Sequence, residues 1–330
     1  MSSVESVRVS LGTAGVLGLL RLQSNAEPTT AYLMTYTQGS CRANCGFCPQ
    51  ASGSSSTRNM LSRVVWPDFS FGTFLEKAVP CLLGGKFQRI CIQALNYPKF
   101  VDDVTQIAHS ILSKAWVPIS VSCPPIGRKE MEHLKEIGVE RIGIPIDAAT
   151  PELFERMKGS LAKGPYHWDS HFEALKAALA VFGRNKVSTH LIVGLGETER
   201  DIVEVVQNLS EMGVNPGLFA FTPVKGTRLE KSKRPEIGQY RRVQVARYLI
   251  MQGTSSVQLM TFEDDGRIMD FGTSPDVLHK TILLGYPFRT SGCPGCNRPF
   301  YNESPRGPLY NYPRDLNHEE TEKALREIAI

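Results

Sequence analysis

The chain has 330 residues, of which 42% are hydrophobic and 21% are charged, a composition that supports a sizeable packed core and excludes a disordered chain. Its 37 basic and 33 acidic residues give a net charge of +4, which is too balanced for a nucleic-acid binder and at most permits an acidic protein partner. Eight cysteines are too few for a disulfide scaffold. Residues 1–9 are polar, and the apolar run 16–20 is far shorter than the ~20 residues that span a bilayer. We therefore expect a cytoplasmic protein with reduced thiols and no membrane partner.

Short apolar runs alternate with helical segments along the middle of the chain. The runs that we expect to form strands are 34–37, 89–94, 118–123, 141–146, 187–193, 218–224 and 256–261. Between them, Thr150 and Thr198 are predicted to cap helices, and Ser170 with Glu173 fits a capping box. This alternation predicts an α/β fold, a TIM-like barrel of parallel strands, complete or partial. In such a barrel the chemistry lies at the carboxyl ends of the strands.

Three regions differ in composition. Residues 1–30 are expected to be an N-terminal extension and residues 31–275 the barrel. From Arg289 onward the chain is rich in Pro, Gly, Asn and Tyr and lacks helical periodicity until Glu319. We therefore expect residues 276–330 to form an irregular C-terminal extension over the barrel, followed by a final helix.

Three cysteines stand at short spacing directly after the first predicted strand. The motif Cys41-Arg-Ala-Asn-Cys45-Gly-Phe-Cys48 has the spacing C-x3-C-x2-C. Three thiolates this close can each bind one iron of a cubane [4Fe–4S] cluster, which leaves one iron free for a small chelating molecule. The alternative is a structural zinc site, but zinc usually takes four protein ligands, and this loop has no nearby histidine. The motif therefore favours an iron–sulfur cluster.

The loop resembles that of radical S-adenosylmethionine (SAM) enzymes, and most of all that of biotin synthase and its relatives. Three further segments in the same order carry the resemblance, which extends over residues 30–270: Arg89-Ile-Cys91, the run from His190 to Thr198 (HLIVGLGET), and the run from Phe221 to Thr227 (FTPVKGT). The resemblance implies that the cluster binds SAM and cleaves it to a 5′-deoxyadenosyl radical. It implies no catalytic residue beyond the cluster and SAM.

The resemblance also implies which residues contact SAM. They are Phe47, Asp147, Gly194, Gly196, Glu197 and Val224. Each has a structural alternative: a glycine pair after a strand is often part of a turn, and Asp147 could cap the helix that begins near Thr150.

A second cluster is expected from the same resemblance, but the pattern matches only in part. Biotin synthase holds a sulfur-donating [2Fe–2S] cluster through three cysteines and an arginine. Here Cys91 and Cys123 stand in matching places, whereas Ser188 and Gln258 stand where the third cysteine and the arginine are expected. A biotin synthase in the strict sense is therefore disfavoured.

The motif Cys293-Pro-Gly-Cys296 in the C-terminal extension offers two more thiols. Together with Cys91 and Cys123 it would supply four ligands for an auxiliary [4Fe–4S] cluster. Half of a zinc site, or a redox pair, is the alternative.

A biotin-synthase-like barrel with an auxiliary cubane resembles lipoyl synthases, and most of all the two-protein lipoyl synthase of archaea and some bacteria. The resemblance implies a sulfurtransferase that adds sulfur to an octanoyl chain on a lipoyl-carrier protein, with a second radical SAM component and an electron donor such as ferredoxin as partners. The carbon radical left by hydrogen abstraction would attack a sulfide of the auxiliary cluster. Another radical SAM reaction (mutase, methylase or cofactor maturase) and a non-enzymatic metal-binding module are the alternatives.

Overall fold

Six parallel strands form the centre of the molecule. The computed structural model describes residues 4–304 and 306–328. The strands are β2 (Thr30–Thr35), β6 (Arg89–Gln93), β7 (Ile119–Ser122), β8 (Arg141–Gly143), β9 (Val187–Val193) and β10 (Val214–Ala220). They pair in chain order, each parallel to the next, and no pairing joins β2 to β10 within the described residues. The expected α/β barrel of parallel strands is confirmed, in a form whose first and last parallel strands, β2 and β10, are not hydrogen-bonded to each other in the described structure.

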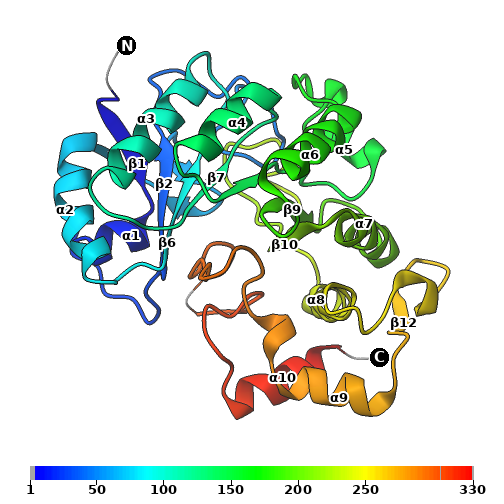
Figure 1. Cartoon of the computed structure of the whole chain (residues 1–330). Coiled ribbons are helices and arrows are strands. Elements are labelled where there is room, and N and C mark those ends of the chain that lie inside the picture. The colour runs from blue at the N-terminus through cyan, green and yellow to red at the C-terminus, as the bar shows by residue number, and fades with distance from the viewer. Residues whose placement is uncertain (1–3, 305, 329–330) are drawn as a thin grey trace.

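Helices connect the strands and cover their outer side (Figure 1). They are α2 (Phe71–Leu83), α3 (Phe100–Leu112), α4 (Arg128–Glu136), α5 (Pro151–Met157), α6 (Trp168–Phe182), α7 (Glu199–Met212) and α8 (Ile237–Met251). In a strand, alternate side chains face opposite sides, so each strand has one face toward these helices and one toward the barrel interior. In β6, Ile90 and Ile92 are fully buried in the hydrophobic core, whereas Cys91 and Gln93 line the interior cavity.

Two short strands extend the sheet beyond β2. Strand β1 (Ser6–Val9) pairs antiparallel with β2, and β5 (Asp68–Ser70) pairs antiparallel with β1. Helix α1 (Leu11–Val16) follows β1, and the hairpin of β3 (Met60–Leu61) and β4 (Val64–Val65) precedes β5. The proposed division at residues 30 and 275 stays a prediction, and part of the expected N-terminal extension lies within the sheet.

The prediction of a seventh strand at residues 256–261 is wrong. Residues Val257–Leu259 form a 3-10 turn, and only Thr261–Phe262 is extended, as β11, pairing with β12 (Ile268–Asp270) in a separate hairpin. Leu259 is 61% exposed. Met260 is buried in the core and Val257 packs against it, so these apolar residues are used for packing outside the barrel sheet and not as a barrel strand.

The last part of the chain packs against α8 and returns to the barrel. Helix α10 (His318–Ile328) packs against both α8 and α9 (Pro275–Leu283) (Figure 1). The chain between these two helices includes residues 289–303, which we name the closing segment. This segment passes between strands β2 and β10. On one side Thr29 Oγ1 and Thr30 Oγ1 donate hydrogen bonds to Gly295 O at 2.6 and 2.8 Å. On the other side Leu218 N in β10 donates to Ser291 Oγ at 2.8 Å. The closing segment therefore fills the gap that β2 and β10 leave.

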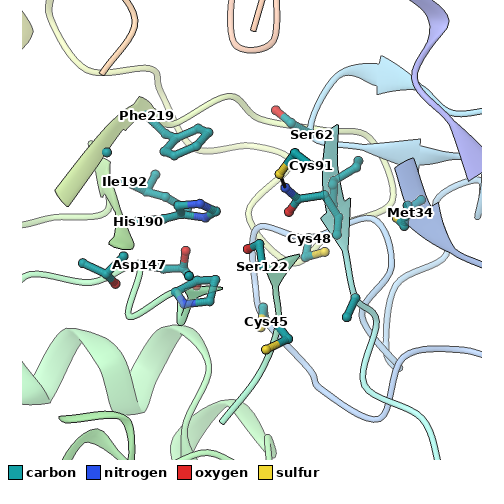
Figure 2. A pocket seen from close by; sticks show the side chains of 18 of the residues that line it. Met34, Cys45, Cys48, Ser62, Cys91, Ser122, Asp147, His190, Ile192 and Phe219 are labelled. Carbon is teal, nitrogen blue, oxygen red and sulfur yellow. Dashed lines mark hydrogen bonds between the residues drawn. The ribbon is translucent and has the colours of Figure 1, made fainter. Parts of the chain in front are cut away.

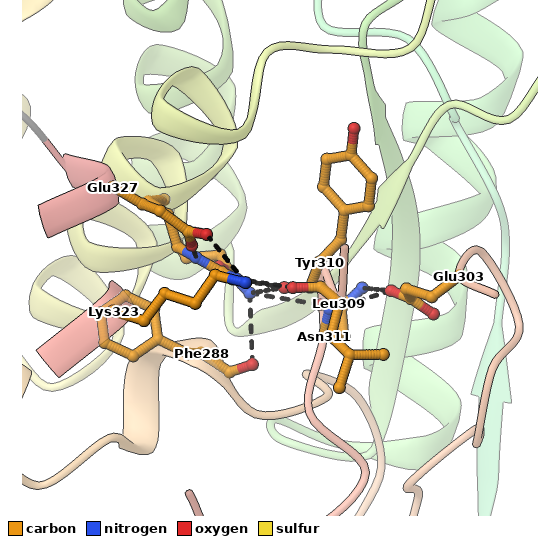
Figure 3. A network of polar contacts seen from close by, with 9 residues as sticks. Phe288, Glu303, Leu309, Tyr310, Asn311, Lys323 and Glu327 are labelled. Carbon is orange, nitrogen blue, oxygen red and sulfur yellow. Dashed lines mark hydrogen bonds and ion pairs between the residues drawn. The ribbon is translucent and has the colours of Figure 1, made fainter. Parts of the chain in front are cut away.

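A buried polar network holds this C-terminal part in place (Figure 3). At its centre Arg241 of α8, only 1% exposed, donates to Glu327 Oε2 at 2.9 Å, Tyr310 O at 2.7 Å and Leu309 O at 2.5 Å. Such charge-assisted hydrogen bonds are stronger than neutral ones and give the segment a defined path. No helix in the described part of the chain has the length and apolar character needed to cross a membrane.

Candidate active site: two groups of cysteines in one cavity

The barrel interior contains a cavity of about 240 Å³. Cysteines from four parts of the chain line it: Cys41, Cys45 and Cys48 from the loop after β2, Cys91 from β6, Cys123 directly after β7, and Cys293 and Cys296 from the closing segment. Figure 2 shows Cys45, Cys48 and Cys91 on one wall of this cavity and His190 and Asp147 on the facing wall. We name residues 41, 45 and 48 the first group, and residues 91, 293 and 296 the second group.

The loop of the first group is fixed by backbone contacts. Cys48 N donates to Cys45 O at 3.0 Å, Gly46 N donates to Met157 O at 2.7 Å, and Asn96 N donates to Cys41 Sγ at 3.4 Å. Burial raises the pKa of Cys45 to about 12, and burial together with the two neighbouring thiols raises that of Cys48. Without a bound cation these thiols are therefore neutral, and a metal that binds them must displace their protons.

The two kinds of centre expected for the first group, a zinc ion and a [4Fe–4S] cluster, require different arrangements of the thiols. Among the described residues, no three His, Cys, Asp or Glu side chains converge on a point where they could hold one metal ion. A single zinc ion requires such convergence, because each Zn–S bond is about 2.3 Å long. A cubane does not, since each thiolate binds its own iron. Three buried thiols that face one cavity from a single loop therefore fit a [4Fe–4S] cluster better than zinc.

The second group joins residues that are about two hundred positions apart in the sequence. Gln93 Nε2 donates to Cys91 Sγ at 3.0 Å, and Ser120 Oγ donates to Cys293 Sγ at 3.5 Å. The hydroxyl of Tyr32 lies 3.5 Å from Cys296 Sγ. Burial raises the pKa of Cys91, and the thiols of Cys293 and Cys296 raise it further, so the three sulfur atoms lie within electrostatic reach of one another.

Cys123 lines the same cavity but has no described contact with the second group. It follows β7, in which Ser120 is paired with Cys91 and faces the same interior. Cys123 also packs with Ile119 and Val121 in the hydrophobic core. Burial alone raises the pKa of Cys123 to about 12, with no contribution from another cysteine. The expected set of four thiols stays a prediction: three of them interact with one another, and Ser120 donates to Cys293.

Arg298 is a functional candidate that sequence reasoning missed. Its guanidinium lies 3.9 Å from the ring centroid of Phe219, its Nη2 donates to Ser291 O at 2.6 Å, and its backbone N donates to the Tyr32 hydroxyl at 2.9 Å. It therefore holds a positive charge beside the thiol of Cys296. Its position two residues after the C-x2-C pair was the available signal.

A buried ion pair lies beside the first group. Asp147 Oδ2 accepts from Lys158 Nζ at 2.7 Å, and both residues line the cavity. Lys158 is 3% exposed and also donates to Pro145 O, while its ammonium lies 5.1 Å from the ring centroid of Tyr166. Asp147 does not cap the following helix, because Thr150 does so by accepting from Leu153 N. Lys158 was not singled out in the sequence, since an isolated lysine carries no motif.

Of the five other residues expected to contact SAM, one lines the cavity and four are not among its described lining residues. Phe47 lines the cavity with Asp147, whereas Gly194, Gly196, Glu197 and Val224 are not among the described lining residues. The Glu197 carboxylate accepts from Gly194 N at 2.5 Å and Leu195 N at 2.9 Å, which closes the turn after β9. Gly194 and Gly196 have φ of +103° and +115°, so the turn requires glycine. These contacts support the structural alternative for that turn.

His190 of β9 projects into the cavity from the wall that faces Cys91 and Cys48 (Figure 2). Its ring lies 4.7 Å from that of Phe219. Burial lowers the pKa of His190 to about 4, with Asp147 opposing and Arg298 adding to the shift. The imidazole is therefore neutral near pH 7 and can donate one hydrogen bond and accept one.

Comparison with known proteins identifies the family. The model of the radical SAM superfamily matches residues 35–209, which include the first group, Cys91, Asp147 and His190. The chain belongs to the radical SAM superfamily. Membership implies a [4Fe–4S] cluster and SAM as cofactors, and the first group, on the loop directly after β2, is the place in this radical SAM protein that fits such a cluster.

Relatives and solved structures agree with this assignment. Biotin synthase of Persephonella marina is 27% identical over 206 residues, which are 61% of this chain and 57% of the relative. The ribosomal protein uS12 methylthiotransferase RimO of Thermus thermophilus is 27% identical over 46% of this chain and 35% of its own length. The matches thus span little more than half of the first relative and a third of the second.

Two solved structures share the fold. Methylornithine synthase (PylB) superposes with a TM-score of 0.52 at 16% identity, over 67% of this chain and 62% of that one. The [FeFe]-hydrogenase maturase HydG of Carboxydothermus hydrogenoformans superposes with a TM-score of 0.52 at 18% identity, over 90% of this chain and 66% of that one. At these identities the similarity supports the radical SAM fold alone.

Proposed function

We propose that this radical SAM enzyme inserts sulfur at an unactivated carbon, and that it is one component of a two-protein lipoyl synthase acting on an octanoyl chain attached to a carrier protein. The observation that supports it is the second group, in which Cys91, Cys293 and Cys296 face the same cavity as the first group. Three buried thiols are suitable ligands for an auxiliary iron–sulfur cluster, which contains sulfide. Two relatives are, by name, a biotin synthase and a methylthiotransferase.

The charges of the cavity favour an uncharged part of a substrate. Among the described lining residues the permanently charged side chains are Asp147, Lys158 and Arg298. The first two neutralise each other at 2.7 Å, and the third donates to a backbone carbonyl and stacks on Phe219. A small charged substrate would therefore have to compete for these partners, whereas an alkyl chain needs none. His190 is neutral near pH 7 and adds no charge.

Different residues line the two ends of the cavity, and each end has a different role in the proposed reaction. When bound at the first group, the cluster and SAM supply a carbon-centred radical. The Asp147–Lys158 pair gives that end a fixed arrangement of polar atoms, and Phe219 with Tyr301 gives the other end an aromatic wall. The closing segment excludes water from the side of the barrel, which protects a reactive carbon from unwanted reactions.

The first test is the iron and sulfide content of anaerobically reconstituted protein, with Mössbauer spectra. Two cubanes would give about eight irons in the wild type, and about four each in a Cys41/Cys45/Cys48→Ala and a Cys293/Cys296→Ala variant. About four irons in the wild type and none in the first variant would exclude a second cluster, and sulfur insertion from it would be excluded too. Each variant must first show wild-type circular dichroism, because metal binding and folding are coupled.

The second test is the product. Octanoylated carrier protein is incubated with the enzyme, SAM and a strong reductant, with and without a second radical SAM component, and analysed by mass spectrometry. We expect a sulfur atom in the octanoyl chain with the wild type, and SAM cleavage without that sulfur in Cys293/Cys296→Ala. Cleavage of SAM by the wild type with no sulfur in any product would instead indicate a mutase, methylase or maturase reaction.

A further inference from the structure

A strongly basic segment follows β10 on the outside of the barrel. Residues 225–234, which we name the basic segment, contain one acidic residue, Glu230. Their five cations are Lys225, Arg228, Lys231, Lys233 and Arg234. All except the half-buried Arg234 are exposed, and none of the five forms an ion pair with a described residue. Elsewhere, by contrast, Arg241 and Arg242 of α8 each bind a carboxylate.

The basic segment lies directly on the loop of the first group. Leu229 N donates to Gly46 O at 3.1 Å, and Ser55 N donates to Gly226 O at 2.9 Å. The guanidinium of Arg228 packs on Gly46 so closely that a Cβ added there would meet its Nη2 at 2.5 Å. The same guanidinium donates to Met157 O at 3.3 Å. Gly46 stands between Cys45 and Cys48, so Arg228 covers the outer side of the cysteine loop.

Neighbouring residues extend this basic surface and add an apolar contact. Arg42 in the loop itself, Arg156 of α5 and Lys163 are exposed, and none of them is in an ion pair within the described chain. Leu161 is 69% exposed, and the adjacent Ala162 O accepts from Asn44 Nδ2 of the cysteine loop at 2.7 Å. The Glu155 carboxylate also lies here and accepts from Ser160 N at 2.7 Å. A surface rich in unpaired cations with an exposed leucine is a composition suited to an acidic protein partner.

We infer that this surface, the basic segment together with Arg42, Arg156, Leu161 and Lys163, docks an acidic one-electron donor protein. The inference rests on radical SAM membership and not on sulfur insertion, because SAM cleavage in this family consumes an electron from outside the chain. The docked donor loses one electron and the centre held by the cysteine loop gains it; no bond or proton changes place. A carrier protein is a less suitable occupant, because the surface covers the loop that takes up electrons.

The experiment compares two charge-reversal variants with the reconstituted wild-type enzyme. The surface variant is Lys225/Lys231/Lys233→Glu, which alters exposed side chains and leaves Arg228 and its contacts with the cysteine loop unchanged. The matched control is Lys77/Lys86/Lys114→Glu, which changes the net charge by the same amount at exposed positions on α2, after α2 and after α3, near the amino ends of β6 and β7. Reduction by a small, prereduced acidic ferredoxin is followed by stopped-flow absorbance, and reduction by dithionite serves as the donor-independent reference.

We expect the second-order rate constant with ferredoxin to fall at least about tenfold in the surface variant at low salt and to stay near wild type in the control. The difference in rate constant between the surface variant and the wild type should become smaller as the salt concentration is raised, because salt screens the attraction between the basic surface and ferredoxin. The Kd for oxidised ferredoxin should rise in parallel, with dithionite rates and iron content unchanged. Equal ferredoxin rates in all three proteins would overturn the inference. So would an unchanged rate combined with a raised KM for octanoylated carrier protein, which would assign the surface to the carrier.

Discussion

The two cysteine groups reach the same cavity by different routes. The first group lies within eight consecutive residues after β2, and the loop's own backbone bonds hold it. The second joins Cys91 in the middle of a strand to two cysteines of the closing segment, whose position depends on the packing of α8 and α10. The first is a local structure, and the second exists only when the whole fold is complete. Damage to the C-terminal part should therefore affect the second group selectively.

The largest effect is expected from Arg241→Met. This change leaves Glu327 without its buried cation and Leu309 O without its donor, while Tyr310 O keeps only Gln244 Nε2, so the free energy of unfolding should fall by about 4 kcal/mol. Urea denaturation measures this, and limited proteolysis should cut the closing segment first. The iron of the second group should be lost while that of the first is kept. The control Arg128→Met removes an exposed pair with Glu132 and should cost less than about 1 kcal/mol.

A somewhat smaller effect is expected beside the first group, from Lys158→Met. The Asp147 carboxylate then remains buried without its cation, which should lower the free energy of unfolding by about 3 kcal/mol. Adding Asp147→Asn should restore much of that loss, because the uncompensated charge is removed. Losses that simply add in the double variant would show that the pair is not coupled. Iron in the second group should be unchanged in both variants.

His171, which also lines the cavity, should make stability depend on pH. Burial lowers its pKa to about 3, and its buried Nε2 has no hydrogen-bond partner within the described structure. Because the folded pKa lies below the unfolded value of about 6.5, the unfolded chain binds the proton first. The contribution of neutral His171 to the free energy of unfolding is fully present above about pH 6.5 and is lost as the pH falls toward 3. At pH 5 this loss amounts to about 2 kcal/mol. In His171→Phe this part of the acid sensitivity should disappear, measured by urea titrations at pH 7.5 and 5.

As a reference for that experiment, His318→Phe alters a histidine whose side chain is 86% exposed. It should leave the difference in stability between the two pH values as it is in the wild type. An equal reduction of acid sensitivity in both variants would assign the effect to something other than burial of His171.

The smallest effect is expected from Cys123→Ala. Because burial alone raises the pKa of Cys123, with no contribution from another thiol, we expect it not to be a cluster ligand, so its loss should cost about 1 kcal/mol and no iron. Cys91→Ala should instead lose the iron of the second group, as measured by iron content and Mössbauer spectra. A loss of iron in Cys123→Ala equal to that in Cys91→Ala would restore the four-thiol set expected from the sequence.

Most of the fold could be predicted because its signals are local. Thr150 and Thr198 cap α5 and α7 as expected, the latter in a capping box with Asp201. The capping box at Ser170 was wrong, since α6 already begins at Trp168 without a side-chain cap. There the ring of Trp168 packs on Phe154 at 5.7 Å, and tertiary packing extends the helix past its local start signal.

The site could be predicted only where it is contiguous or repeats a known motif. For Cys123 the two-residue period of Ile119 and Val121 predicts the apolar side, but β7 ends at Ser122 and Cys123 also lines the cavity, so the period alone does not decide its role. For Lys158 and Arg298 no periodicity exists, because their roles come from partners brought close by the fold. Residues that act through long-range contacts have no pattern of their own in one sequence.

The closing segment also sets an order of assembly. Ribosomes make a chain from its N-terminus, and the cysteines of the first group are available once β2 and its loop have emerged, whereas the pocket for Cys91 is completed only by residues near 293 and 296. Until then the barrel has an open side between β2 and β10, through which iron and sulfide can be delivered to its interior. Afterwards that side is occupied by protein. Formation of the second group is thus coupled to the last stage of biosynthesis, because its three thiols come together only when the closing segment has reached the barrel.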